Sequence, residues 1–209
     1  MDANQESPYN PFGMDESCQN CPELAETRSQ VVHGYGDVSA EFAFVGGFPD
    51  SGADEVGIPF MGAGRETTLE ILRETGFTDS PPETTEPELD NAVLTYAARC
   101  HHPEREPTGE EFSACELYLT SELRMINPEI IVGVGQHALE ALAWEYTTRS
   151  ADEFDVEAEH ASTVRGRGFE IVPMIEPAEQ TDAQTDALIE HMLDILDRDY
   201  RQTKGRRGR

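Results

Sequence analysis

The sequence predicts an α/β fold of three layers, α/β/α, around a short and mainly parallel four-stranded sheet. Four short apolar segments have the length and composition of buried strands. They alternate with segments whose apolar residues recur at helical spacing. Strands that alternate with helices form parallel sheets covered on both faces. At 209 residues, we expect one domain over residues 1–200, followed by a basic tail at 201–209.

The first half of the chain contains two of the strand candidates. Residues 41–47 read as a buried strand that ends in glycines, and a glycine-rich loop runs on to residue 64. A helix is expected over 65–75. Residues 79–90 hold three prolines among acidic residues and predict an exposed loop. The second strand is expected over 91–98, directly before Cys100.

A capping-box pattern at Thr108–Glu111 predicts the start of the next helix. Five residues share its expected inward face: Phe112, Cys115, Leu119, Leu123 and Ile126. The third strand is expected at 129–135.

The last third of the chain completes the alternation of strands and helices. A helix is expected at 137–146, and an acidic, loop-like insert at 149–163. The fourth strand is expected at 169–175. A final helix is marked by Leu188, Met192, Ile195 and Leu196.

Ligand sites of parallel sheets lie at the carboxyl ends of the strands. Three such ends, residues 46–49, 99–103 and 176–177, should therefore converge.

The composition is strongly acidic. The chain has 42 acidic and 15 basic residues, a formal net charge of −27, and Lys204 as its single lysine. In about 1 M salt the screening length falls to roughly 3 Å, which removes most of the resulting self-repulsion. We expect a halophilic protein. Because no apolar run approaches the ~20 residues that span a bilayer, and the N-terminus lacks a signal peptide, we expect it to be soluble and cytoplasmic.

The four cysteines are Cys18, Cys21, Cys100 and Cys115. The first two form a Cys-x2-Cys turn that can grip one metal centre. A four-thiolate site suits an iron–sulfur cluster or zinc. Zinc ribbons usually carry two close cysteine pairs and this chain has one, so the cluster is favoured and zinc stays the alternative.

Four segments in order resemble the family 4 uracil-DNA glycosylases. Residues 46–62 (GGFPDSGADEVGIPFMG) are similar to the family's first motif, and residues 95–107 (TYAARCHHPEREP) to its cysteine-containing segment. Residues 128–135 (PEIIVGVG) and 172–178 (VPMIEPA) match further motifs, and the cysteine spacing agrees. The resemblance extends over roughly residues 18–196.

The resemblance implies base-excision repair, in which a damaged base is flipped from DNA and excised. It implies a [4Fe-4S] cluster held by the four cysteines. Phe60 matches the aromatic on which the flipped base stacks. The implied base-binding residues are Gly46, Gly47, Phe48, Pro49, Asp50, Phe60 and Tyr96. Asp54 and Glu176 fall at catalytic motif positions, although Asp54 could instead hold its loop through backbone amides.

Three positions depart from the family pattern. Gly47 replaces the motif acid, Tyr96 replaces the Asn that reads the uracil edge, and Glu176 replaces a His that stabilises the departing base. A phenol offers one oxygen where an amide offers a donor and an acceptor. Glu176 could assist the leaving base only when protonated, or serve as the base that activates water.

Contacts with DNA need local positive groups, because a net charge of −27 repels phosphates. The candidates are Arg99, His101, His102, Arg105, Arg165 and Arg167. We expect a monomer that binds single-stranded or lesion-containing DNA. Three hypotheses remain open: an active glycosylase, a catalytically silent homologue that binds DNA or a repair partner, and a zinc-bound structural protein.

Overall fold

The computed structural model describes residues 7–202, and these form a six-stranded sheet in the order β1-β3-β2-β4-β6-β5. The four central strands are parallel, whereas β1 and β5 pair antiparallel at the two edges. The strands are β1 Tyr35–Gly36, β2 Phe42–Gly46, β3 Ala92–Tyr96, β4 Ile130–Val134, β5 Val164–Arg165 and β6 Glu170–Met174. The predicted strands are β2, β3, β4 and β6. The two edge strands are too short to show any alternation in the sequence.

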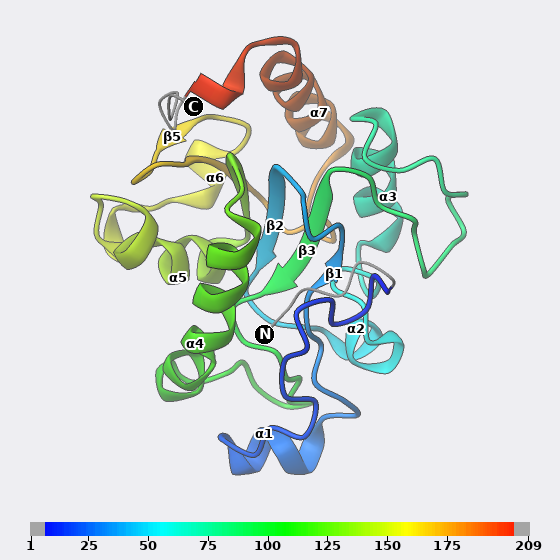
Figure 1. Ribbon diagram of the computed structural model, residues 1–209, viewed down its shortest axis with the longest axis vertical. Coiled ribbons are helices and arrows are strands. Elements are labelled where there is room, and N and C mark those ends of the chain that lie inside the picture. Colours follow the sequence, from blue (N-terminus) through cyan, green and yellow to red (C-terminus); the bar gives the residue numbers. More distant parts are fainter. Residues whose placement is uncertain (1–6, 203–209) are drawn as a thin grey trace.

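Helices cover both faces of the sheet, as predicted (Figure 1). In Figure 1, α3 and α7 lie on one side of the strands, and α4 and α5 lie on the other. The helices are α1 Pro22–Thr27, α2 Ser51–Val56, α3 Arg65–Glu74, α4 Gly109–Ile126, α5 Gln136–Tyr146, α6 Val156–Glu159 and α7 Asp182–Asp197, with 3-10 turns at Ala151–Glu153 and Tyr200–Gln202. Of these, α1, α2 and α6 were not expected, since all three are too short to give a helical period.

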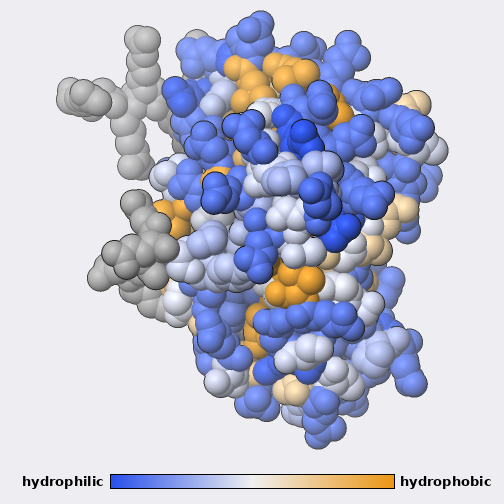
Figure 2. All heavy atoms as spheres, turned by 90° about the vertical axis from the view of Figure 1, so that its right-hand side faces the viewer, coloured by the Kyte–Doolittle hydropathy of each residue, from blue (hydrophilic) through white to orange (hydrophobic). Residues whose placement is uncertain are grey.

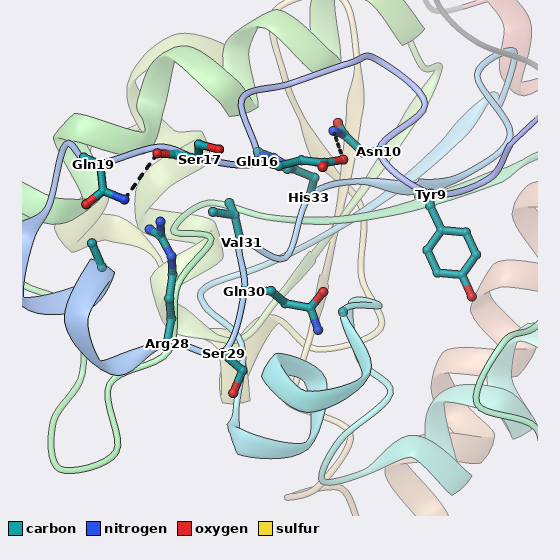
Figure 3. A pocket seen from close by; sticks show the side chains of 12 residues that line it. Tyr9, Asn10, Glu16, Ser17, Gln19, Arg28, Ser29, Gln30, Val31 and His33 are labelled. Atoms are coloured by element: carbon teal, nitrogen blue, oxygen red, sulfur yellow. Dashed lines mark hydrogen bonds between the residues drawn. The ribbon is translucent and has the colours of Figure 1, made fainter.

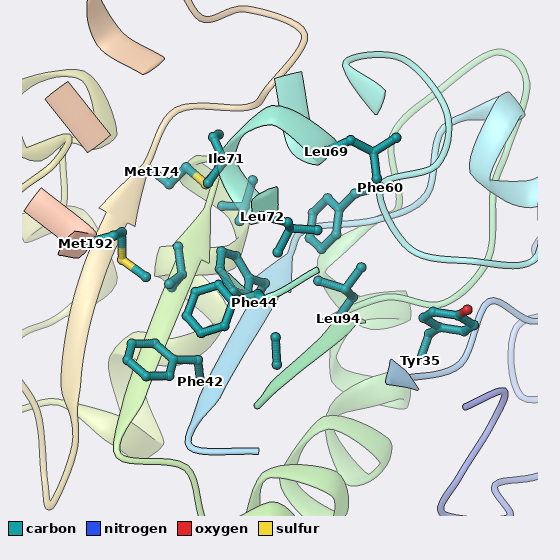
Figure 4. Close-up of a cluster of buried hydrophobic side chains, with 14 of the residues drawn as sticks. Tyr35, Phe42, Phe44, Phe60, Leu69, Ile71, Leu72, Leu94, Met174 and Met192 are labelled. Carbon is teal, nitrogen blue, oxygen red and sulfur yellow. The ribbon is translucent and has the colours of Figure 1, made fainter. Parts of the chain in front are cut away.

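Each face of the sheet packs its own hydrophobic core. Figure 4 shows the core under α3 and α7, where Phe44 of β2 lies near Leu72 and Phe42 lies farther along the same strand. The alternate residues of the same strand, Ala43 and Val45, face the second core under α4 and α5. Since a strand buried on both faces has no polar side, the central strands read as continuous apolar runs.

The start of α4 confirms the predicted capping box. The Thr108 side chain accepts from the Glu111 amide at 3.3 Å, and a Glu111 carboxylate oxygen accepts from the Thr108 amide at 2.7 Å. The predicted inward face of the helix is also buried, apart from the half-buried Phe112.

The insert at 149–163 is more ordered than the expected acidic loop. It contains the turn Ala151–Glu153 and α6. Arg149 forms an ion pair with Glu159, and its guanidinium lies 4.1 Å from the centre of the Phe154 ring. The acidic residues at alternate positions of this insert give no helical pattern in the sequence, so its local contacts were not predicted.

The surface is mostly hydrophilic, and Figure 2 shows only small apolar patches on the face in view. Within residues 7–202, none of the helices is long and apolar enough to cross a membrane. Of the predicted basic tail, residues 203–209 lie outside the described residues. Arg201 pairs with Glu41 at 2.5 Å.

Candidate functional site

A cavity of about 490 Å³ lies at the carboxyl ends of the four parallel strands. Its lining includes Phe48 after β2, Tyr96 at the end of β3, Gly135 after β4 and Glu176 after β6. The predicted convergence of residues 46–49 and 176–177 is therefore confirmed. Residues 99–103 do not line the cavity, but His101 Nδ1 lies 3.1 Å from the Pro49 carbonyl oxygen.

Phe60 and Tyr96 form one wall of the cavity. The Tyr96 hydroxyl accepts a hydrogen bond from the Phe60 amide at 2.8 Å, and the two ring centres are 5.0 Å apart. Phe60 has a positive φ of 64°, a left-handed conformation that is uncommon outside glycine. A Cβ at Gly46 would lie 2.7 Å from both rings. The glycine therefore leaves room for this aromatic wall.

Asp50 holds the loop that carries Phe60. Its Oδ1 accepts from the Ala53 amide at 2.7 Å and caps α2, while Oδ2 accepts from the Ala63 amide at 2.5 Å. Both carboxylate oxygens thus bind backbone groups at the two ends of the loop. Asp50 also lines the cavity, so its negative charge contributes to the field there.

Glu176 has the cavity's most perturbed carboxyl group. Burial raises its pKa to about 7, and the charges of Glu179 and Asp50 add to the rise. Gly135 permits this position, because a Cβ there would lie 2.2 Å from Glu176 Oε1. Near neutral pH the carboxyl group can therefore be protonated and donate a hydrogen bond, or be ionised and accept a proton.

His137, at the start of α5, is a cavity residue that the motifs did not identify. Its ring is stacked parallel to Phe112, with ring centres 5.6 Å apart, and it meets Phe48 edge-on at 5.5 Å. Its Nε2 lies 3.4 Å from a carboxylate oxygen of Glu106. A signal was present, because His137 is the second residue after the end of the strand predicted at 129–135.

Gln136 connects the insert at 149–163 to the cavity. Its side-chain amide donates to the Phe154 carbonyl at 3.0 Å, and its oxygen accepts from the Val156 amide at 3.2 Å. Val156 and Glu157 then line the cavity. The insert thus forms one wall of the site, although the sequence analysis predicted only an acidic loop there.

Asp54 does not line this cavity, although it was a catalytic candidate. It is buried in α2, and its Oδ2 accepts from the Ser29 amide at 2.7 Å. The Gln30 side chain donates to the Asp54 carbonyl at 2.9 Å. These contacts correspond to the alternative that the sequence left open, in which Asp54 holds a loop through backbone amides.

The prediction that Arg99 contacts DNA is wrong, because the structure buries this residue. It is fully buried and forms a two-pronged ion pair with Glu122, with both N–O distances 2.7 Å. Thr95 donates to the same carboxylate at 2.6 Å, and His33 Nδ1 lies 3.2 Å from the guanidinium. Arg99 has no surface to offer to a phosphate. Glu122 was not singled out in the sequence, since its partner lies 23 residues away.

The other basic candidates lie in three places. Arg105 is partly exposed and bridges Glu111 at the start of α4 and Glu23 in α1. His101 and His102 are half-buried in the loop after β3. Arg165 and Arg167 are exposed, but they do not lie beside the cavity as expected for DNA contacts. Arg165 pairs in register with Glu170, the first residue of β6, so this pair lies at the end of the sheet opposite to the cavity.

The four cysteines are buried and free of disulfides, and they come from the region of α1, the end of β3 and α4. Burial raises the pKa of Cys21 to about 11, and the other three thiols contribute to the rise. The four sulfurs therefore share one neighbourhood.

Arg28 was not identified in the sequence, but it contacts two parts of this neighbourhood. Its guanidinium donates to Cys100 Sγ at 3.1 Å and to the Cys18 carbonyl at 2.5 Å. In Figure 3 its side chain extends from the end of α1 toward the loop of Ser17 and Gln19. Burial raises the pKa of the Cys100 thiol, and the positive Arg28 donor opposes this rise and so favours the thiolate, the form that binds metal.

The donor set thus fits a thiolate-held group. Within residues 7–202, no three His, Cys, Asp or Glu side chains are close enough together to hold a single metal ion. Zinc needs all four sulfurs about 2.3 Å from one ion. A [4Fe-4S] cluster instead takes one thiolate per iron, so the same four cysteines are the candidate ligands of either group.

Comparison with known proteins gives a consistent match. Residues 33–197 match the family model of the uracil DNA glycosylase superfamily. The chain is 31% identical over 156 residues to the type-4 uracil-DNA glycosylase of Archaeoglobus fulgidus, covering 74% of this chain and 69% of that protein. For the Thermotoga maritima type-4 enzyme the identity is 33% over 125 residues, with 59% of each chain covered. The type-5 uracil-DNA glycosylase of Thermus thermophilus is 31% identical over 157 residues, 65% of this chain and 71% of that protein.

Proposed function

Because the chain belongs to the uracil DNA glycosylase superfamily, we propose that it is a DNA glycosylase that flips and excises uracil or a related base. The single observation that carries the proposal is the cavity at the strand ends, where an aromatic wall faces Glu176. A volume of about 490 Å³ is ample for one base. The relatives named as uracil-DNA glycosylases support the same reaction.

In the proposed reaction, water adds to C1′ of the deoxyribose and the C1′–N bond breaks. The electron pair of that bond goes to the departing base, and the proton released by water completes the free base. Phe60 offers its ring to the extruded base, and stacking of this kind contributes about 1–3 kcal/mol to binding. Protonated Glu176 donates a hydrogen bond to an oxygen of the departing base.

We further propose that Cys18, Cys21, Cys100 and Cys115 hold a [4Fe-4S] cluster. The support is their shared burial and the donor from Arg28. When bound, the cluster would tie α1, the end of β3 and α4 together. The cavity chemistry is assigned to other residues, so the cluster's proposed role is structural. Reduced thiols also suit a cytoplasmic protein, since the cytosol keeps thiols reduced.

Recognition of DNA is proposed for the edge of the sheet that carries the cavity. His101 and His102 lie in the loop after β3, and His101 contacts the loop of Pro49. Arg105 belongs to the same segment, but its charge is shared with Glu23 and Glu111. Few positive groups are available here. Base stacking and hydrogen bonds should therefore contribute most of the affinity in molar salt.

The test is cleavage of a uracil-containing single strand by purified monomeric protein in molar salt, followed by alkali to break the abasic site. We expect strand cleavage with wild type and a loss of rate with Phe60→Ala. Duplexes containing uracil, hypoxanthine or xanthine define the base. Binding of these DNAs without release of any base would instead identify a catalytically silent homologue, as the departures at Gly47, Tyr96 and Glu176 allow.

A further inference from the structure

The cavity is lined by acidic residues: Asp50, Glu106, Glu157, Glu176 and Glu179. Among the residues that the structure describes, His137 alone lines this cavity and has a side chain that can be positively charged. When a C1′–N bond breaks, the base departs with the bond's electron pair and carries negative charge. Ionised carboxylates repel that charge, so a nearby cation would stabilise the departing base.

The geometry points to His137 as that cation: we infer that its imidazolium stabilises the negative charge of the departing base. This inference rests on the proposed function and adds a catalytic residue to it. The electron pair of the broken bond goes to the base, whose oxygens face the imidazolium. The base later takes up the proton released by the water that attacks C1′.

Three contacts hold the imidazole in the cavity wall. Glu106 lies 3.4 Å from Nε2, and a carboxylate at this distance attracts the protonated ring. Phe112 stacks parallel to the ring at 5.6 Å, and the edge-on Phe48 limits its rotation. The two aromatic contacts restrict the orientation of the ring, and the Glu106 carboxylate lies beside its Nε2. The N-terminus of α5 opposes a positive charge, whereas Glu106 beside the ring and the other acidic residues of the cavity favour one.

Gly47 makes this position possible. A Cβ on residue 47 would lie only 2.9 Å from His137 Cβ, closer than real side chains approach. Any larger residue at position 47 would push His137 away from its place. His137 can therefore occupy its place in the cavity because residue 47 has no side chain.

The kinetic test compares two leaving bases in single-turnover cleavage by wild type and His137→Gln. 5-Fluorouracil leaves as a more stable anion than uracil and needs less help. We expect His137→Gln to slow uracil excision by about 10²–10³-fold, as does loss of one oxyanion-stabilising donor. The loss for 5-fluorouracil should be at least about tenfold smaller.

His137→Arg should recover part of the rate on uracil, because it keeps a positive charge. His191→Gln, on α7 beside Thr163, is the matched control and should behave as wild type.

A binding test does not depend on catalysis. Barbiturate is a pyrimidine that is anionic at neutral pH, whereas uracil is neutral. We expect His137→Gln to weaken barbiturate binding by about tenfold or more, as for loss of a charged hydrogen bond, and to leave uracil binding nearly unchanged.

The two tests separate the possible failures. Equal slowing on both bases, or no slowing by His137→Gln, overturns the inference and leaves the glycosylase function standing. If wild type excises neither base but binds barbiturate through His137, the glycosylase proposal fails and the anion site stands. If barbiturate binding is absent or the same in both proteins while excision is also absent, both proposals fail.

Discussion

The Tyr96 hydroxyl accepts a hydrogen bond from the Phe60 amide at 2.8 Å and holds Phe60 in a left-handed conformation at the cavity wall. The resemblance placed Tyr96 among the base-binding residues, in place of the Asn that reads the uracil edge. Its hydroxyl oxygen instead already accepts a hydrogen bond from the backbone of Phe60. Burial also raises the pKa of Tyr96, so the phenol stays neutral at any pH at which the protein would be studied. The residue positions the stacking ring, and only its hydroxyl proton remains for other contacts.

Tyr96→Phe should therefore lower both stability and base binding. The substitution leaves the buried Phe60 amide without its acceptor, which costs about 1–3 kcal/mol in the free energy of unfolding. We expect a similar loss in affinity for a lesion-containing strand, because the Phe60 ring is less well held. Denaturant unfolding and fluorescence titration measure the two effects. Tyr9→Phe, at an exposed tyrosine, is the control. Unchanged stability in Tyr96→Phe would contradict this role of the hydroxyl.

Glu176 should make activity depend on pH near neutrality. Its pKa is raised to about 7, so the protonated form that donates to the base is lost as pH rises through 7. We expect the rate of uracil excision to fall above pH 7 in wild type, and Glu176→Gln to remain partly active without the part of this fall that Glu176 causes. A pH profile of single-turnover rates measures this. A rate that rises with pH, with an inactive Glu176→Gln, would identify Glu176 as the water-activating base.

The same group should affect stability. Because the folded-state pKa lies above the unfolded value of about 4.5, the folded state binds the proton more tightly, and stability falls as pH rises from 4.5 to 7. Glu176→Gln removes this ionisation. We expect the variant to gain stability relative to wild type on going from pH 4 to pH 8, as measured by thermal melts at several pH values. A difference that does not change with pH would contradict the raised pKa.

The cysteine site predicts a coloured protein. Protein purified without oxygen should contain about four iron atoms per chain, as in other Cys₄-ligated clusters, and absorb visible light. Cys100→Ser should lose iron and colour and melt at a lower temperature. Ser17→Ala, beside Cys18, is a control that leaves all four thiols in place. Stoichiometric zinc without iron in anaerobic preparations would contradict the cluster.

The Arg99–Glu122 pair predicts a large stability effect far from any surface. Glu122→Gln leaves the buried guanidinium without a counter-charge, and breaking a buried pair in this way costs about 3–5 kcal/mol. Denaturant unfolding in molar salt should show the loss, because buried pairs are weakly screened. Glu170→Gln removes the more exposed pair with Arg198 and should cost less than about 1 kcal/mol. Equal effects of the two substitutions would rule out this account.

Asp54→Asn tests whether Asp54 takes part in the chemistry. An Asn oxygen can still accept from the Ser29 amide, so we expect a modest change in melting temperature and an excision rate within a few-fold of wild type. If Asp54→Asn loses as much excision rate as Phe60→Ala while keeping normal stability, Asp54 takes part in catalysis.

Much of the fold was predictable from the sequence because its signals are local. The central strands are buried on both faces and read as apolar runs, and the capping box of Thr108 and Glu111 lies within one turn of helix. The motifs around Phe60 and Glu176 also pointed correctly to one cavity, since the carboxyl ends of parallel strands meet at one edge of the sheet.

The tertiary structure decided what those residues do. Arg99 was expected to contact DNA, but it is buried in an ion pair with Glu122, and the Tyr96 oxygen proved to accept from the Phe60 amide. His137 became a cavity residue only through the space left by Gly47. Sequence patterns report burial and local hydrogen bonding, which depend on near neighbours. The charge state and partner of a polar side chain depend on groups far along the chain, and only folding brings these together.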